Sequence, residues 1–257
     1  MALLEVRALS RSFGGLAAVS ALDFDVNEGE ILGIIGPNGA GKSTVFNLIS
    51  GAIPVTSGTL HFRGEDITKL APHERAGRGI SRLFQGNVLF PNFTVMTNVV
   101  AGLHLHTNLG LFGFLFGGPS ARRKEEILYS KAMEILQFVG LAGEADRIAS
   151  SQPHGNQRHL CLAIALAAEP KLLLLDEPVT GMNAGEVSGM LAMIRTLREE
   201  KGITCIVVEH NMKAVMGLCD RIVTISYGKK IAEGTPKEIS SNPKVIEAYL
   251  GAEQHAT

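Results

Sequence analysis

Two kinds of hydrophobic pattern alternate along the chain and predict different layers of structure. Residues 4–26 alternate between apolar and polar positions, which is typical of short antiparallel strands with one buried face. Four later stretches, 31–35, 172–175, 203–208 and 221–225, are nearly continuous apolar runs. Such runs, when helical segments separate them, predict parallel strands that are buried on both faces. We therefore expect an α/β fold with a mixed core sheet and an N-terminal antiparallel β subdomain.

Glycine and proline divide the rest of the chain into smaller elements. The expected elements are a hairpin over 51–64 with its turn at 54–58, a helix over 72–77, a strand over 80–84, helical periods at 94–107 and 120–139, a helix over 211–218, an edge strand over 229–234 and a helical tail over 236–250. The domain prediction that follows is a core with its β subdomain over 1–85 and 161–235, a helical subdomain over 86–160 and a C-terminal tail over 236–257.

The composition fits a well-filled core and gives no sign of a nucleic-acid partner. Of the 257 residues, 46% are hydrophobic and 19% are charged, so extensive disorder is not expected. The formal net charge is −1, whereas nucleic-acid-binding proteins usually carry a clearly basic surface. A local basic patch remains possible at residues 122–124, although most such triplets are solvated helix faces.

The cysteines and the hydropathy of the chain indicate in which cellular compartment the protein works. Cys161, Cys205 and Cys219 lie in apolar surroundings without a C-x-x-C spacing, which favours buried thiols in a reducing cytoplasm over disulfides or a zinc site. The N-terminus does not have the pattern of a signal peptide, and no apolar stretch approaches the roughly 20 residues of a spanning helix. If the protein works at a membrane, we expect another subunit to hold it there.

The segment that carries the chemistry lies between the apolar run 31–35 and an expected helix at 45–49. It reads Gly36-Pro37-Asn38-Gly39-Ala40-Gly41-Lys42-Ser43-Thr44 and matches the phosphate-loop pattern G-x-x-x-x-G-K-[ST]. Glycines let backbone N–H groups surround a polyphosphate, and the positive end of the following helix faces the same anion. Lys42 can reach the β- and γ-phosphates, and the Ser43 hydroxyl can ligate Mg²⁺. The segment therefore predicts binding of a nucleoside triphosphate, rather than an ordinary glycine-rich turn.

Two carboxylates, Asp176 and Glu177, directly follow the leucine run 172–175. At the C-terminal edge of a parallel sheet both would stand beside the phosphate loop. Asp176 is then the carboxylate on the Mg²⁺ side, acting through water, and Glu177 is the candidate general base that orients or deprotonates the attacking water. Acidic residues at strand ends are often helix caps, but the upstream phosphate loop favours a catalytic role here.

The order of these motifs resembles that of the ATP-binding-cassette ATPases, a group with the P-loop NTPase fold. The shared motifs are the phosphate loop, Gln85 after a strand, the segment 155–158, the pair Asp176-Glu177 and His210. More narrowly, the segments 11–16 (RSFGGL), 90–95 (FPNFTV), 208–212 (VEHNM) and 228–250 (GKKIAEGTPKEISSNPKVIEAYL) resemble the ATP-binding subunits of bacterial branched-chain amino-acid importers. The resemblance runs from about residue 3 to residue 251. The phosphate loop is common to many NTPases, whereas the whole set is specific to cassettes.

The resemblance implies roles for three further residues. Phe13 would stack on adenine, where a tyrosine is commoner; the alternative is an aromatic packed on its own hairpin. Gln85 would touch Mg²⁺ and the attacking water and report the nucleotide state to membrane subunits, although a lone strand-end glutamine is usually a surface group. His210 would contact the γ-phosphate and hold the water–glutamate geometry, unless it is a core histidine satisfied by backbone. The implied catalytic set is Glu177, His210 and Gln85, and the implied Mg²⁺ set is Ser43, Gln85 and Asp176.

One element departs from the family pattern. The signature loop, usually Leu-Ser-Gly-Gly-Gln, here reads Gln152-Pro153-His154-Gly155-Asn156. In the family this loop caps the ATP of the other subunit, and Pro153 offers neither a hydroxyl nor an N–H. Part of the anion site, His154 to Asn156, is expected to survive, with a helix that starts near Asn156. We expect the ATP site that uses this loop to be the weaker of two. Asn183 also stands where most cassettes carry Asp.

The family mechanism implies particular partners. Two cassette subunits would enclose ATP between them; the partner is a second ATPase chain or a second copy, and the altered signature favours a different chain. The insert at 86–118 would receive a helix of a transmembrane permease subunit, and an extracytoplasmic solute-binding protein would take part indirectly. Phe112, Phe114 and Phe116 would either line that groove or pack within the helical subdomain. The implied location is peripheral, on the cytoplasmic face of the inner or plasma membrane, where the permease subunits hold the protein.

Other readings stay open at this point. A soluble cassette ATPase for DNA repair or ribosome work usually has fused tandem cassettes or long coiled coils, whereas this chain has one cassette and no heptads. A nucleotide-gated subunit with weak hydrolysis is favoured by Pro153 and opposed by Glu177 and His210. The transported solute, whether a leucine-type amino acid, another amino acid, urea or a short amide, is not determined by these residues.

Overall fold

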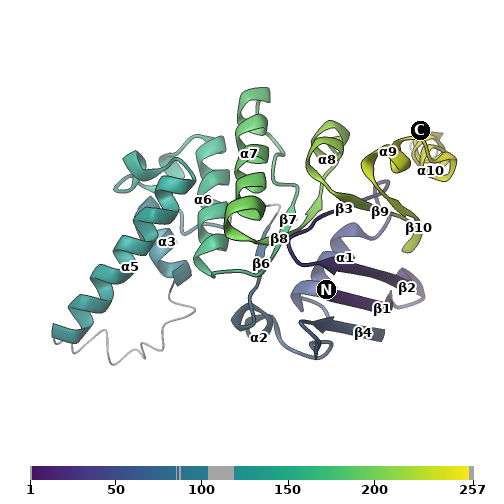
Figure 1. Ribbon diagram of the computed structural model, residues 1–257, viewed down its shortest axis with the longest axis horizontal. Helices are drawn as coiled ribbons and strands as arrows, with labels where there is room; N and C mark the ends of the chain where they lie inside the picture. The colour runs from purple at the N-terminus through teal and green to yellow at the C-terminus, as the bar shows by residue number, and fades with distance from the viewer. Residues whose placement is uncertain (1, 85, 87, 104–118, 255–257) are drawn as a thin grey trace.

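The computed structural model describes residues 2–84, 86, 88–103 and 119–254, and these form two sheets and a set of helices that pack mainly along the larger sheet (Figure 1). The smaller sheet is antiparallel, with the order β2-β1-β4-β5. Its strands are β1 (Ala2–Phe13), β2 (Leu16–Asn27), β4 (Ser57–Phe62) and β5 (Glu65–Asp66). The expected antiparallel β subdomain is therefore confirmed, although β1 and β2 are twelve-residue strands rather than short ones.

The larger sheet has the order β10-β9-β3-β8-β7-β6. Its strands are β3 (Ile31–Ile35), β6 (Ile80–Leu83), β7 (Leu172–Asp176), β8 (Thr204–Val208), β9 (Arg221–Ser226) and β10 (Lys229–Gly234). The first five run parallel, and β10 joins the edge antiparallel. Strand β7 shows why the apolar runs are continuous: Leu172 and Leu174 join one core cluster, whereas Leu173 and Leu175 join the other.

The helices cover both faces of the larger sheet. They are α1 (Lys42–Ser50), α2 (Pro72–Gly77), α3 (Val95–Leu103), α5 (Pro119–Phe138), α6 (His154–Ala167), α7 (Ala184–Lys201), α8 (Met212–Leu218), α9 (Pro236–Ser240) and α10 (Pro243–Gln254), with 3-10 turns at Ala142–Glu144 and Ala149–Ser151. Helices α3, α5 and α6 lie together at one end of the molecule, and α9 and α10 lie at the other (Figure 1). Within the ranges that the structure describes, no helix is long and apolar enough to span a membrane.

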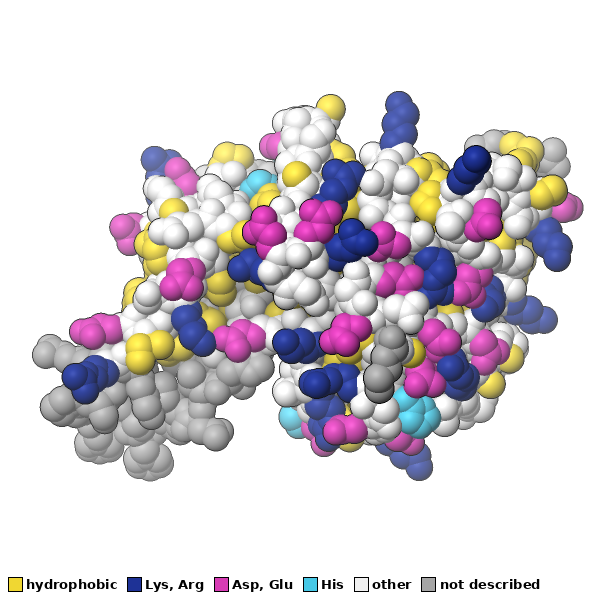
Figure 2. Space-filling view, viewed as in Figure 1, with side chains coloured by type: hydrophobic (Ala, Val, Ile, Leu, Met, Phe, Trp, Pro, Cys, Tyr) yellow, Lys and Arg dark blue, Asp and Glu magenta, His cyan; other side chains and the backbone are white. Residues whose placement is uncertain are grey.

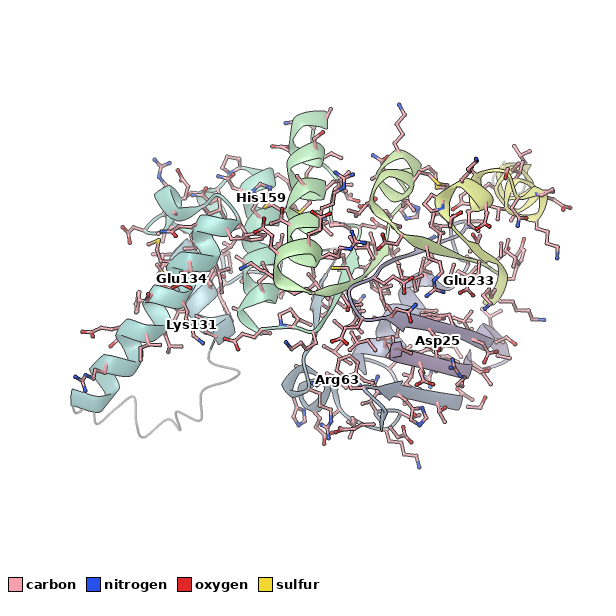
Figure 3. All side chains as sticks on the ribbon, in the orientation of Figure 1. Asp25, Arg63, Lys131, Glu134, His159 and Glu233 are labelled. Carbon is pink, nitrogen blue, oxygen red and sulfur yellow. The ribbon has the colours of Figure 1, made fainter. Side chains whose placement is uncertain are left out.

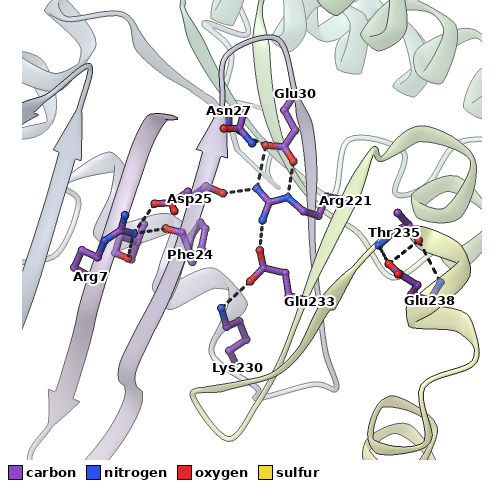
Figure 4. A network of polar contacts seen from close by, with 11 residues as sticks. Arg7, Phe24, Asp25, Asn27, Glu30, Arg221, Lys230, Glu233, Thr235 and Glu238 are labelled. Carbon is purple, nitrogen blue, oxygen red and sulfur yellow. Dashed lines mark hydrogen bonds and ion pairs between the residues drawn. The ribbon is translucent and has the colours of Figure 1, made fainter. Parts of the chain in front are cut away.

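A charged network joins the two sheets near one end of β9 (Figure 4). The Arg221 guanidinium donates to both carboxylate oxygens of Glu30, at 2.7 and 3.0 Å, and to the backbone carbonyl of Asp25 in β2, at 2.6 Å. It also pairs with Glu233 in β10, which accepts from Lys230 at 2.7 Å. The hydrogen bond with Glu30 is the main cause that raises the pKa of Arg221. One side chain thus connects β2, β9, β10 and the turn before β3.

The expected hairpin over 51–64 is wrong, because β4 pairs with β1 and β5 instead of with residues 51–56. Pairing with β1 lets β4 bury Leu60 and Phe62 in the core. The tight turn follows β4, at Arg63 and Gly64, whose φ angles are +53° and +79° (Figure 3). Of the residues assigned to the turn from their composition, Pro54 and Thr56 precede β4, and Ser57 and Gly58 are its first two residues. A local turn signal was outweighed by a long-range pairing that buries apolar surface.

Three further expectations can be compared with the structure. Helix α6 begins at His154, two residues before the expected start, and the C-terminal tail is two helices interrupted at residues 241–242. The cysteines are buried and form no disulfide within the described residues, and burial raises the pKa of Cys161 to about 11 and those of Cys205 and Cys219 to about 12. These thiols therefore belong to the core, as the sequence predicts. The boundaries of the helical subdomain stay a prediction.

Candidate nucleotide-binding and catalytic site

The candidate site lies where three neighbouring parallel strands end. The phosphate loop follows β3, Glu177 follows β7, and His210 follows β8 by two residues. Together they line a cavity of about 530 Å³, a size within the usual range for small-molecule sites. The lining is completed by residues 16–18 of β2, residues 38–44 and Tyr227. The structure thus brings Lys42, Ser43, Glu177 and His210 to one cavity, at the carboxyl edge of a parallel sheet where ligands commonly bind.

The phosphate loop takes a backbone path that needs glycine. Gly39 and Gly41 have φ angles of +77° and +105°, and Gly41 directly precedes α1. A Cβ atom on Gly41 would lie 2.5 Å from the Ala18 carbonyl oxygen, and one on Gly36 would collide with the Ile225 carbonyl oxygen. The first N–H groups of α1 have no acceptor within the helix. The loop therefore presents backbone donors and the positive end of α1 to the cavity, which suits a phosphate group.

Lys42 lies inside this loop and is mostly buried. Its Nζ donates to the carbonyl oxygens of Gly36, at 2.7 Å, and Pro37, at 3.0 Å. Burial lowers the pKa of Lys42, while the charges of Glu177 and Asp176 oppose that shift. The amino group is thus held over the loop by weak neutral acceptors, which an anionic phosphate can replace as a better partner.

Glu177 adopts a backbone conformation that directs its carboxylate at the cavity. Its φ angle is +50°, uncommon for a residue other than glycine, and its N–H donates to the Val208 carbonyl oxygen at 2.8 Å. The carboxylate oxygen Oε1 lies 2.8 Å from Nε2 of His210, and Oε2 accepts from the Thr180 hydroxyl at 3.2 Å. Glu177 and His210, which were each predicted as catalytic residues, are therefore in direct contact in the structure. A carboxylate held in this way can orient a water molecule or take its proton.

Sequence reasoning missed Glu209, which organises the neighbouring backbone. Its side chain is buried and accepts N–H groups of Val179 at 2.9 Å, His210 at 3.1 Å and Asn211 at 3.4 Å. Burial raises the pKa of Glu209, and these three hydrogen bonds oppose the rise. The side chain ties the segment after β7 to the segment after β8, which places Glu177 and His210 opposite each other. A charged residue directly after a buried strand was the available signal.

Sequence reasoning also missed Arg82, the partner of Asp176. Nη2 of Arg82 donates to Oδ2 of Asp176 at 2.6 Å, and the two side chains are only 8% and 6% exposed. Asp176 lies at the end of β7, next to the residues that line the cavity but outside the lining itself. The predicted acid is thus at the expected edge of the sheet, and a buried cation engages it. An arginine in the short strand β6 gave the signal, but its partner could not be read from the sequence.

Of the described residues that were predicted to bind the nucleotide or its cation, Phe13, Gly36 and Asp176 do not line the cavity. Phe13 ends β1 with 48% of its surface exposed, and the Arg11 guanidinium lies 4.6 Å from its ring centroid. The aromatic residue that lines the cavity is Tyr227, which is 83% exposed and was not singled out in the sequence. Gln85 lies outside the described residues, as do Phe112, Phe114 and Phe116.

The altered signature loop lies away from this cavity and packs against its own subunit. Pro153 is the N-cap of α6 and supplies no side-chain cap. His154 lies against Gly181, and a Cβ on Gly155 would be 2.5 Å from the Glu186 carboxylate. Asn156 donates to the side chain of Gln152 at 2.9 Å. The three predicted signature residues therefore sit together at the positive end of α6, where they could face an anion of another subunit.

The residues present fit Mg²⁺ when it arrives with a nucleotide. Ser43 lines the cavity, the Asp176 carboxylate lies at its edge, and Mg²⁺ usually needs only one or two protein oxygens beside the substrate phosphates and water. Within the described ranges, no group of three or more His, Cys, Asp or Glu side chains could hold a metal ion by itself. The donor set thus suits a nucleotide-bound cation better than a resident metal.

Comparisons with known proteins identify the family of this chain. The family model for ABC transporters matches residues 19–180, and that for branched-chain amino acid ATP-binding cassette transporters matches residues 229–255. The high-affinity branched-chain amino acid transport ATP-binding protein BraF of Pseudomonas aeruginosa is 41% identical over 97% of this chain and 98% of its own length. LivG of Escherichia coli, which has the same description, is 40% identical with the same coverage.

A solved structure gives the same answer for the fold. The ADP conformation of MJ1267, an ATP-binding cassette of an ABC transporter, superposes with a TM-score of 0.85 at 32% identity, covering 98% of this chain and 99% of that one. The expected P-loop NTPase fold of the cassette type is thereby confirmed. The chain belongs to the ABC transporter family, as an ATP-hydrolysing, ATP-binding subunit that carries the C-terminal segment of the branched-chain amino acid type.

Proposed function

We propose that this protein is the ATPase subunit of a membrane importer for branched-chain amino acids. The proposed solute class is supported by the similarity to BraF over 97% of the chain, together with the matching C-terminal segment. The test is to assemble the purified chain with its permease subunits in liposomes and to measure ATP hydrolysis with a loaded solute-binding protein. Stimulation by leucine, isoleucine or valine supports the proposal. Stimulation by urea or short amides alone would replace it with the alternative solute class.

The proposed chemistry assigns one task to each group in the cavity. Lys42 and the N–H groups at the start of α1 hold the β- and γ-phosphates of ATP. Glu177 orients the attacking water and takes its proton, and His210 fixes the carboxylate through the 2.8 Å contact. Stabilising charge on the γ-phosphate and positioning the water are the main contributions that a protein makes to phosphoryl transfer.

The cation would be held by Ser43 and, through water, by Asp176, with Gln85 as a third proposed contact. Mg²⁺ bound there supplies positive charge against the phosphate oxygens of ATP. The protein's own contribution is to place the Asp176 carboxylate, which the end of β7 and the contact with Arg82 fix in the structure. Phe13 remains the proposed adenine-stacking residue, and Tyr227 is a second aromatic candidate because it lines the cavity.

A surface groove supports the proposal that permease subunits dock on the helical side. The groove has a volume of about 260 Å³ between α2, β6, α3 and α6, and it is mostly apolar. It is lined by residues that include Phe84, Val88, Gly102, Cys161 and Ile164. Near it, Phe90 and Phe93 stack with ring centroids 5.4 Å apart while each stays about half exposed. Exposed aromatic residues beside an apolar groove are suited to receive a partner helix.

The proposed second subunit is a cassette ATPase, and a different chain is favoured. Pro153 cannot donate a hydrogen bond to the partner's ATP, so a homodimer would have two weak sites. A heterodimer with an intact signature would have one strong site, formed by this chain's phosphate loop and the partner's signature loop. A two-tag purification checks this: recovery of two differently tagged copies of this chain in one complex would refute the heterodimer.

The remaining partners and the location follow from the same proposal. The permease subunits would hold the protein at the cytoplasmic face of the inner or plasma membrane, and a solute-binding protein outside would act through them. Nucleic acid is not a proposed partner, since basic and acidic side chains are interspersed over the face seen in Figure 2. Purification from native membranes tests the location, and recovery only with ribosomes or nucleic acid would refute it.

A second candidate function has one observation in its favour. The N-cap position of α6 is occupied by Pro153 without a side-chain cap, which suits a nucleotide-gated subunit with weak hydrolysis. The formed contact between Glu177 and His210 favours an active site instead. The turnover number of the assembled complex decides between them, because a gating subunit would bind ATP normally and release almost no phosphate.

A further inference from the structure

The contact between Arg82 and Asp176 has a consequence for metal binding. Arg82 lies in β6 and Asp176 at the end of the adjacent strand β7, and Nη2 approaches Oδ2 to 2.6 Å. The two side chains are 8% and 6% exposed, so water screens their interaction little. A buried carboxylate without a counter-charge is costly, and Arg82 supplies the charge that offsets this cost.

The guanidinium is fixed on several sides. Nη1 donates to Oδ1 of Asn47 in α1 at 2.7 Å, and the guanidinium carbon lies 4.7 Å from the ring centroid of Phe84 and 5.6 Å from that of Phe46. Its Nε is buried without a hydrogen-bond partner among the described residues. The cation is therefore held in place by packing and by Asn47, and it does not follow Asp176 freely.

A buried cation and Mg²⁺ are attracted to the same carboxylate. Mg²⁺, or a water molecule in its shell, contacts a carboxylate through the lone pairs of its oxygens. Arg82 already uses a lone pair of Oδ2. We propose that Arg82 is a positioning residue that acts as the resident counter-ion of Asp176 and competes electrostatically with Mg²⁺ at this carboxylate. Arg82 thereby sets the Mg²⁺ concentration at which nucleotide binds tightly. The inference rests on the proposed function, because it assumes that Asp176 faces the nucleotide-bound cation.

The test measures nucleotide binding at equilibrium rather than turnover. A fluorescent non-hydrolysable ATP analogue is titrated onto the full-length chain at increasing Mg²⁺, and the concentration that gives half of the Mg²⁺-dependent gain in affinity is recorded. Arg82→Met removes the charge at similar length, so that concentration should fall by about tenfold or more, since an opposite charge this close shifts carboxylate equilibria by about one to three decades. Arg82→Lys keeps the charge and should stay within about twofold of wild type.

Each outcome separates the inference from a merely structural role. If Arg82→Met lowers thermal stability but leaves the half-saturating Mg²⁺ concentration unchanged, Arg82 only holds the fold and the inference is wrong. If Arg82→Met does not fold, Arg82→Gln provides the readout. That variant removes the charge but keeps an amide that can donate to Asp176, so an Mg²⁺ dependence equal to wild type would again overturn the inference.

A variant of the carboxylate separates this inference from the proposed function. If the carboxylate helps to hold the cation, Asp176→Asn should reduce the Mg²⁺-dependent gain in affinity for the analogue by at least about tenfold. An unchanged dependence in Asp176→Asn would mean that the proposed role of Asp176 has failed. A changed dependence in Asp176→Asn with none in Arg82→Met would mean that only the role of Arg82 has failed.

Discussion

Replacing Glu177 by glutamine isolates the chemical role of the carboxylate from its place in the structure. The side chain is 12% exposed, and its contacts include His210 at 2.8 Å and the Thr180 hydroxyl at 3.2 Å. Glutamine has nearly the same shape and offers both an oxygen and an N–H₂ group, so it can keep contacts to both neighbours. What it cannot do is accept a proton from water.

The size of the expected effect follows from these contacts. A positioned general base contributes about two to four decades to a rate, or roughly 2.7 to 5.5 kcal/mol of activation free energy. Loss of one neutral hydrogen bond would account for only about 0.5 to 1.5 kcal/mol, which is roughly a decade or less. Glu177→Gln should therefore lower turnover by about a hundredfold to ten-thousandfold and leave ATP affinity within about threefold.

The assay combines single-turnover phosphate release with equilibrium ATP binding on the same preparation. Glu134→Gln, an exposed position in α5 marked in Figure 3, is the matched control and should behave as wild type in both measurements. Turnover of Glu177→Gln within threefold of wild type, with normal binding, would refute the assignment of the base. Loss of ATP binding together with turnover would show that the side chain holds the cavity open instead of acting on water.

Four other changes test separate parts of the structure. Lys42→Ala should abolish measurable ATP binding in a titration, because the phosphates lose their buried cation; unchanged affinity would contradict the phosphate-loop role. Arg221→Met should lower the free energy of unfolding in urea by about 3 kcal/mol, because Glu30 stays buried without its partner. Pro153→Ser should raise thermal stability by about 1 kcal/mol through an N-cap on α6, and raise turnover of the assembled complex by about tenfold. Burial raises the pKa of Glu209 above its ordinary value of 4.5, so the stability it contributes is complete below that pH and declines as pH rises; urea titrations from pH 4 to 7 should show this decline in wild type and a flatter curve in Glu209→Gln.

Much of the fold could be predicted because the informative patterns are local. The leucine run before Asp176 and the runs of β3 and β8 are apolar at almost every position, and only strands buried on both faces need this. The hairpin expected over 51–64 failed because the partner of β4 is β1, about fifty residues away in the sequence. Turn-forming residues mark where the chain can bend, but they do not say which strand it meets afterwards.

The residues of the candidate site also differ in whether the sequence predicts them. Lys42, Glu177 and His210 could be named from the sequence because each has a fixed spacing from a motif or stands just after an apolar strand. Arg82 and Glu209 were not named, because their importance depends on partners 94 and 30 residues away, although Glu209 also directly follows an apolar strand. Both are buried charged side chains outside the cavity lining, and each supports a group in the cavity or next to it. Sequence patterns thus identify side chains that contact the ligand more readily than the buried side chains that hold those contacting groups in place.

The backbone at Glu177 shows how the fold directs the catalytic group. A left-handed conformation costs a residue with a Cβ roughly 1 to 2 kcal/mol, and Glu177 adopts it with φ of +50°. The hydrogen bond from its N–H to Val208 and the three N–H groups that Glu209 accepts fix the chain on both sides of the cavity edge. If Glu177 continued the extended path of β7, its side chain would alternate to the opposite face of the sheet from Asp176. The left-handed turn instead carries the carboxylate over the strand end to His210, so the backbone strain serves to place the candidate base beside the phosphate loop.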